Sequence, residues 1–152
     1  MTLRIEYRSV APGAVAALGK LNDYSDHCSI EAALRRLVEV RTSQVNGCSH
    51  CIRVHRRQVL RLGEAEARLD ALEDWRSSDL FQESERAVLA WAEDVTLIAA
   101  SGAPEAGYQA LRAFFSEAEI VDLTFIILSM NAWNRLAISF GREAPSAPQG
   151  RR

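Results

Sequence analysis

The sequence predicts one all-α domain, and three observations carry that prediction. The chain has 152 residues, which suits a single domain. Apolar residues recur at helical spacing in almost every segment, and strand-like alternation is confined to the N-terminus. Hydrophobic residues make up 48% of the chain and charged residues 25%, which supports a packed core. We expect the domain to span residues 1–141 and the polar residues 142–152 to form a disordered tail.

The first third of the chain is predicted to hold a short arm and two helices. Residues 2–8, TLRIEYR, alternate apolar and polar side chains, as an extended arm or an edge strand does. A helix opens at Pro12 and ends where the polar run NDYSDH, at 22–27, breaks its apolar spacing. The next helix is predicted to begin with Ser29 as its N-cap, and the Asn-Gly turn at 46–47 ends it.

The rest of the chain is predicted to form further helices. They are expected at residues 48–62, 65–75, 84–100, 104–114 and 117–140. Gly63 and Gly141 follow two of these segments, where a left-handed C-cap is favoured. Pro104 fits the first turn of a helix. The sequence SEAE at 116–119 is a capping box, which predicts the start of the final helix.

Charge and hydropathy narrow the class of function. The net charge of −2 favours no nucleic-acid partner, and the arginine-rich run 53–61 is interpreted as a solvated helix face. The first ten residues lack the apolar stretch of a signal peptide. Polar residues interrupt the apolar stretch 120–140, which indicates a buried helix and not a membrane span. We therefore expect a cytoplasmic protein with no membrane partner.

The stretch VNGCSHCIRVH, residues 45–55, carries the candidate chemistry. In a reducing compartment a close Cys-x-x-Cys pair is more often catalytic or metal-binding than structural. On one helix, spacings of three and four residues place Cys48, Cys51 and His55 on the same face. Cys48 would lie in the first turn, where free backbone N–H groups and the helix dipole stabilise a thiolate.

These three side chains suit the reduction of a peroxide. A thiolate attacks the O–O bond and becomes a sulfenic acid, the second thiol converts this to a disulfide, and an external thiol reductant resets the pair. Because His55 lies one turn after Cys51, we assign Cys51 as the peroxide-reactive residue, Cys48 as the resolving residue and His55 as the base. Neither a cofactor nor a metal is predicted.

Other interpretations of the same residues remain open at this point. The three side chains could be zinc ligands in a zinc-stabilised helical module. The fourth ligand would then come from Cys28, His27 or His50. Alternatively, the cysteines could be buried packing residues, or could report oxidation in a redox-sensing oligomer without useful turnover.

The longer run VRTSQVNGCSHCIRVHRR resembles the core motif of the carboxymuconolactone decarboxylase / alkylhydroperoxidase D (AhpD-like) superfamily. Its thiol-active members share a Ser-x-x-Asn-Gly-Cys-x-x-Cys-x-x-x-His pattern, which begins here at Ser43 and ends at His55. The downstream stretches ESERAVLAWAEDVT and LTFIILSMNAWNRLAI resemble the uncharacterised peroxidase-related branch. The resemblance spans about residues 5–140.

The resemblance implies an all-helical fold and the reduction of alkyl hydroperoxides through the cysteine pair. In the best-known type of this superfamily a lipoyl-bearing adaptor supplies the electrons. The decarboxylases of this superfamily lack the cysteine pair, so a lyase activity is less expected here than a peroxidase activity. The resemblance also implies a homo-trimer or homo-hexamer. The final predicted helix, apolar on nearly every side, favours a homo-oligomer independently.

One position departs from the family pattern. Thiol-active members carry a glutamate twelve residues before the first cysteine, and that position is Arg36 here. Glu39, one turn further along the same predicted helix, is expected to replace the missing acid and to serve His55. Acids from another helix are the alternatives, namely Glu83, Glu85 and Glu93.

The remaining candidates are given structural roles. His50 is interpreted as an exposed spectator and Cys28 as an incidental free thiol. Core packing is predicted for Trp91, Trp133 and Phe125. Glu85 is expected to pair with an arginine. Bracing of the cysteine-bearing helix, or a subunit contact, is predicted for Asn131, Asn134 and Arg135, because polar groups on an apolar helix require partners.

Overall fold

The computed structural model describes residues 3–141, and within that range the chain is helical and contains no strand. The elements are α1 (Tyr7–Val10), α2 (Pro12–His27), α3 (Ala32–Val45), α4 (Ser49–Arg61), α5 (Glu66–Ala71), the 3₁₀ helix η1 (Leu72–Ser77), α6 (Glu83–Thr96), α7 (Ile98–Ser101), α8 (Glu105–Arg112) and α9 (Glu117–Phe140). The all-α prediction is confirmed. The predicted tail, 142–152, lies outside the described residues.

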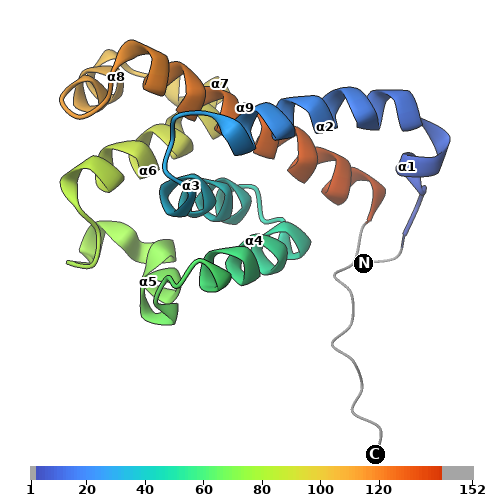
Figure 1. Cartoon of the computed structure of the whole chain (residues 1–152), viewed down its shortest axis with the longest axis horizontal. Coiled ribbons are helices and arrows are strands. Elements are labelled where there is room, and N and C mark those ends of the chain that lie inside the picture. Colours follow the sequence, from blue (N-terminus) through green and yellow to red (C-terminus); the bar gives the residue numbers. More distant parts are fainter. Residues whose placement is uncertain (1–2, 142–152) are drawn as a thin grey trace, which may run out of the picture.

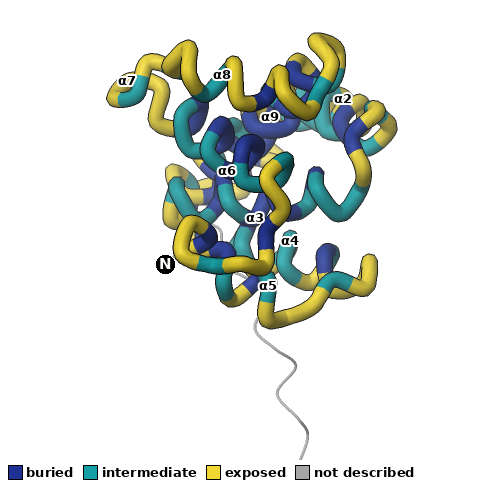
Figure 2. The backbone as a smooth tube through the Cα atoms, turned by 90° about the vertical axis from the view of Figure 1, so that its left-hand side faces the viewer, coloured by how far each residue is buried: buried dark blue, intermediate teal, exposed yellow. Residues whose placement is uncertain are grey.

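Helix α3 is the centre of the fold (Figure 1). It packs against α4, α9 and α6, and α2 lies along α9. Val38 joins a core cluster with α6 and α9, whereas Leu37 and Val40 join a second cluster with α4, α5 and η1. Burial is accordingly concentrated in α3, α6 and α9 (Figure 2). A helix enclosed in this way also buries polar side chains, and Glu39 is one of them.

The final helix has the predicted beginning and end. Ser116 and Glu119 form the capping box, and Gly141 ends the helix in the left-handed region at φ 73°. Its inner face is buried, but Val121, Phe125 and Leu128, spaced four and three residues apart, form an exposed apolar stripe. Core packing of Phe125 was therefore a wrong prediction. No helix in residues 3–141 has the length and hydropathy needed to cross a bilayer.

The N-terminal region differs from the prediction in two ways. Residues 3–6 form an arm, one of the two predicted alternatives, and the Arg4 backbone N–H donates to the Phe140 carbonyl at 2.8 Å, but residues 7–10 form the short helix α1, which was not predicted. The polar run 22–27 does not end α2, which continues to His27. Polar contacts within the helix sustain it there, because the Asn22 amide donates to Asp26 one turn later. The arm at the beginning of the described chain thus contacts the end of α9.

The beginning of α3 was also assigned to the wrong residue. Glu31 is its N-cap, and its carboxylate accepts from the N–H groups of Ala33 and Leu34. The Ser29 hydroxyl instead donates to the buried Asp122 of α9 at 3.1 Å. The Asp122 carboxylate, whose other oxygen accepts from the Tyr24 hydroxyl, takes the serine away from the helix terminus. Similarly, Pro104 is the N-cap of α8 and does not lie in its first turn.

Candidate functional site

A tight turn between α3 and α4 positions the first cysteine. Gly47 adopts φ +69°, and the N–H groups of Gly47 and Cys48 donate to the carbonyls of Gln44 and Ser43. This is a Schellman motif, which satisfies the last carbonyls of α3. Cys48 is at the same time the N-cap of α4, where its sulfur accepts from the Cys51 N–H at 3.4 Å. The sulfur of Cys48 therefore lies where a helix best stabilises an anion.

The two cysteines are joined in a disulfide with a Cα–Cα distance of 5.4 Å. Their relative exposures are 2% for Cys48 and 6% for Cys51. Both pack in a small apolar cluster with Met130 and Ala137 of α9. The pair is thus largely enclosed by α4 and α9, and solvent has little access to its sulfurs.

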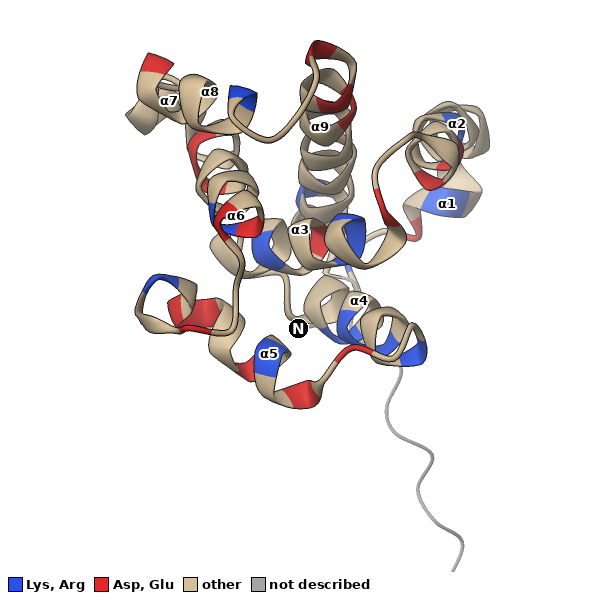
Figure 3. Cartoon of the chain, turned by 60° about the vertical axis from the view of Figure 1, so that its left-hand side comes forward, with Lys and Arg blue, Asp and Glu red and all other residues tan. Residues whose placement is uncertain are grey.

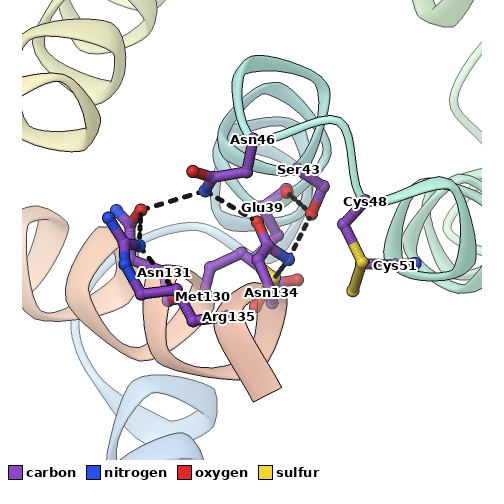
Figure 4. The surroundings of a disulfide bond; sticks show 9 residues. All are labelled: Glu39, Ser43, Asn46, Cys48, Cys51, Met130, Asn131, Asn134 and Arg135. Carbon is purple, nitrogen blue, oxygen red and sulfur yellow. Dashed lines mark hydrogen bonds between the residues drawn. A yellow bond between two sulfur atoms is a disulfide. The ribbon is translucent and has the colours of Figure 1, made fainter. Parts of the chain in front are cut away.

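Polar side chains of α9 hold the turn in place (Figure 4). The Asn46 amide donates at 2.9 Å to the side-chain oxygens of both Asn131 and Asn134. The Asn134 amide in turn donates to Ser43 at 3.2 Å, and Arg135 donates to the Asn131 side chain at 2.6 Å. These contacts agree with the predicted bracing role. They fix the segment that carries Cys48 against α9.

A pocket of about 340 Å³ opens over one of the two cysteines. Its lining is drawn from four helices and comprises Tyr7, Arg8, Val15, Gly19, Asn22, Asp23, His50, Cys51, Val54, His55, Met130, Trp133 and Ala137. Cys51 and His55 are thus brought to one cavity, whereas Cys48 does not line it. Cys51 is therefore the member of the cysteine pair that borders the pocket.

Behind the pocket, His55 meets the buried acid that the sequence predicted. Its Nδ1 lies 2.9 Å from Oε2 of Glu39, which is 3% exposed. The imidazole is turned so that this contact lacks the geometry of a hydrogen bond. Arg36, at the position of the family glutamate, donates to both carboxylate oxygens of Glu39 and also to Asp26 at 2.9 Å. Glu39 therefore bridges an arginine and a histidine.

These neighbours decide the charge of the buried pair. Burial is the largest influence on the pKa of Glu39 and raises it, but His55 and Arg36 together outweigh burial, so the pKa lies below the usual glutamate range. Burial lowers the pKa of Arg36, yet Glu39 and Asp26 more than offset it, and this pKa is raised. Glu39 is accordingly a carboxylate at neutral pH, which suits a partner for an imidazolium and not a proton donor.

The other acids considered are occupied elsewhere or lie outside the pocket. Glu85 caps α6 and pairs with Arg68, as predicted for it. Glu93 accepts from Trp75 and pairs with arginines of α3 and η1. Glu83 begins α6 and is exposed. Glu39 is the acid that contacts His55.

The structure also places His50, Cys28, the possible metal ligands and the arginines of α4. His50 is half-buried and lines the pocket, so the exposed-spectator prediction was wrong. Cys28 is a free thiol whose sulfur donates to the Ser25 carbonyl, as expected of an incidental cysteine. Within residues 3–141, no group of three or more His, Cys, Asp or Glu side chains is arranged to hold a metal ion. The arginines of α4 largely follow its solvent-facing side (Figure 3), as predicted.

The pocket wall from α1 and α2 could not be found in the sequence. Tyr7 and Arg8 belong to a segment predicted as a strand or arm, and Asn22 to a run predicted as a loop. Trp133 was assigned to the core, but it is half-buried and lines the pocket. The one sequence feature that could have indicated this wall is the closeness of aromatic and basic residues in the N-terminal segment, and that feature is weakly specific.

Comparison with known proteins gives a consistent family signal. The model of the carboxymuconolactone decarboxylase family matches residues 12–94. The uncharacterised protein YdfG of Bacillus subtilis is 34% identical over 146 residues, which cover 96% of this chain and 99% of YdfG. The match therefore extends over both chains almost completely.

Two solved structures share the fold. ATU0492 of Agrobacterium tumefaciens, a protein of unknown function provisionally described as an antioxidant defence protein AhpD, superposes with a TM-score of 0.94 at 36% identity, covering 96% of this chain and 100% of that one. An uncharacterised peroxidase-related protein of Ralstonia eutropha, described as an alkylhydroperoxidase AhpD core, gives a TM-score of 0.80 at 22% identity over 91% and 74% of the two chains. At that identity the second match concerns the fold alone.

Proposed function

Because this chain belongs to the carboxymuconolactone decarboxylase family and has its AhpD-like fold, we propose that it is a thiol-dependent peroxidase that reduces small organic hydroperoxides. One observation carries the proposal. Cys51 is half of a disulfide, lines a pocket of about 340 Å³ and shares that pocket with His55, whose other side contacts the carboxylate of Glu39. A nucleophile, a base and a carboxylate partner for the base thus lie next to one another in space, in that order.

The first step consumes the peroxide. The Nδ1 of His55 faces Glu39, so Nε2 is the nitrogen that exchanges protons with the pocket and accepts the Cys51 thiol proton. The thiolate attacks the terminal peroxide oxygen, a sulfur–oxygen bond forms and the O–O bond breaks. The leaving alkoxide takes the proton back from His55 and departs as an alcohol. Cys51 is left as a sulfenic acid.

The second step forms the disulfide. The Cys48 sulfur attacks the sulfenic sulfur of Cys51, and hydroxide leaves as water with the Cys48 proton. In the disulfide form the two Cα atoms lie 5.4 Å apart, a usual distance for a disulfide, and α4 remains helical from Ser49 onward. Two thiols of an external reductant then restore the pair by exchange, and are themselves oxidised to a disulfide. A dithiol such as that of a lipoyl-bearing adaptor supplies both equivalents from one group.

The proposal is tested on reduced protein treated with one equivalent of an organic hydroperoxide. We expect stoichiometric alcohol and a peptide that has lost two hydrogens through a Cys48–Cys51 bond, followed by multiple turnovers when a dithiol is supplied. Disulfide formation without multiple turnovers would favour a redox sensor. Release of zinc on thiol titration would favour a zinc-stabilised module, and exclusive Cys28-linked dimers would contradict the proposed pair.

Glu39 is proposed to act through His55 as a positioning residue. Glu39→Gln should lower kcat/KM about tenfold, less than loss of the base itself, because the imidazolium loses its buried counter-charge. Arg36→Gln should cost less, since the contact between Glu39 and His55 remains. Steady-state rates of both variants between pH 5 and 9 show which substitution lowers kcat/KM more, and thermal unfolding is the control for folding. A larger loss in the Arg36 variant would assign the electrostatic role to the arginine.

We also propose that the protein is a homo-oligomer, a trimer or hexamer, that covers the exposed stripe of α9. Val121, Phe125 and Leu128 are 51%, 41% and 46% exposed, and contiguous exposed apolar surface commonly marks a subunit contact. Light scattering should give a multiple of 16.9 kDa, and Phe125→Glu should lower it. Leu62→Glu, at an exposed leucine outside the stripe, is the matched control. A monodisperse wild-type monomer at micromolar concentration would refute the assembly.

A further inference from the structure

An arginine without an ion-pair partner among residues 3–141 lines the candidate pocket. The guanidinium carbon of Arg8 lies 5.1 Å from the ring centroid of Trp133 and 5.8 Å from that of Tyr7, and all three residues line the pocket. Both distances lie within the range of cation–π attraction, which holds the guanidinium beside the two rings. Among residues 3–141, no carboxylate is in ion-pair contact with it.

The other lining residues define what such a cation could recognise. The cavity around Cys51 is walled by the apolar side chains Val15, Val54, Met130, Trp133 and Ala137. The lining contains one acid, Asp23, which is exposed and not paired with Arg8. A volume of about 340 Å³ lies at the low end for small-molecule sites, which suits a molecule of about one ring and not a long lipid chain.

We propose that Arg8 binds the carboxylate of the substrate, so that the preferred substrates are small hydroperoxides with an apolar body and a carboxylate remote from the peroxide group. The inference rests on the peroxidase function proposed above and specifies its substrate class. A guanidinium fork donates two parallel hydrogen bonds to a carboxylate, and the apolar walls enclose the body. The peroxide end of the substrate is thereby directed toward Cys51, which lines the same cavity and carries the reacting sulfur.

Binding without turnover tests the inference independently of the chemistry. The disulfide form of the wild-type protein is titrated calorimetrically with 4-isopropylbenzoate and with the neutral 4-isopropylbenzamide, which has nearly the same shape. We expect the acid to bind about tenfold more tightly, the scale of one charge-assisted contact at a partly exposed site. Arg8→Gln should bring the two affinities together, and Arg8→Lys should retain part of the difference. Equal affinities in the wild type would overturn the proposal.

Turnover with a matched pair of peroxides separates the two proposals. Cumene hydroperoxide and its 4-carboxylate derivative differ only in the charged group, and the ratio of their kcat/KM values should favour the acid about tenfold in the wild type. The ratio should fall to about one in Arg8→Gln and stay unchanged in Arg53→Gln, an exposed arginine outside the pocket lining. A ratio of one in the wild type would refute the role of Arg8. Absence of turnover with both peroxides would refute the peroxidase, and the binding titration would still decide on Arg8.

Discussion

Cys51→Ser is expected to abolish peroxide reduction, with a loss of at least about 10³-fold, the scale seen when a covalent nucleophile is removed. Cys51 is the member of the disulfide that lines the pocket, whereas Cys48 is 2% exposed and lies outside the lining. In Cys48→Ser the first step should survive, because the nucleophile and His55 remain. One sulfenic acid per chain should then accumulate, and no multiple turnover should follow.

Stopped-flow peroxide consumption and mass spectrometry with a sulfenic-acid trap distinguish the two variants. Cys28→Ser is the matched control, because this third cysteine is a free thiol that donates a hydrogen bond to the Ser25 carbonyl. The activity of the Cys28→Ser variant should equal that of the wild type. The opposite pattern, in which the Cys51 variant traps as a sulfenic acid and the Cys48 variant is inert, would exchange the two roles.

His55→Ala is expected to slow peroxide consumption about 10²-fold, the lower range for loss of a general base. The residue lies one turn after Cys51 on α4, shares its pocket and contacts the buried Glu39 at 2.9 Å. Without the imidazole, the Cys51 thiol should ionise only at higher pH. The thiolate absorbance of the reduced protein, followed against pH, measures this shift in the ionisation of the thiol. The second-order rate constant for the reaction with peroxide measures the effect of the shift on the rate.

His27→Ala supplies the control for this substitution. His27 ends α2, is exposed, and its Nδ1 lies 2.7 Å from the Asp23 carbonyl, outside the pocket lining. The same change of side chain there should leave both the titration and the rate as in the wild type. If His55→Ala also left them unaltered, the histidine would have no part in the mechanism and Cys51 would ionise by the helix terminus alone.

The parts of the site that lie on one helix were predictable from the sequence. A spacing of four residues brings Cys51 and His55 to one face of α4 and to one pocket, and the Asn-Gly turn places Cys48 at the N-cap of that helix. The contact of Glu39 with His55 required the register between α3 and α4, which the family pattern suggested through Arg36. The local motif therefore predicted the candidate reacting groups, and the comparison with the family pattern predicted the acid that contacts His55.

The pocket wall was not predictable, because its residues gain their role only through tertiary packing. Asn22 belongs to a polar run that would break an isolated amphipathic pattern, yet contacts within α2 and with α3 keep that segment helical. Ser29 has the chemistry of an N-cap, but Asp122, distant in sequence, takes its hydroxyl. In the first case side-chain contacts within α2 and from the following helix outweighed the local propensity, and in the second case a partner far along the chain did so.

A pocket that reaches one sulfur of the disulfide has a consequence for steady-state kinetics. In the proposed cycle, peroxide enters over Cys51 when the pair is reduced, and the reductant attacks through the same opening when the pair is oxidised, because Cys48 lies outside the pocket lining. The two substrates therefore occupy one place at different times, as in a double-displacement scheme. Reciprocal plots at several reductant concentrations should be parallel, and an excess of either substrate should inhibit by occupying the form of the enzyme that belongs to the other.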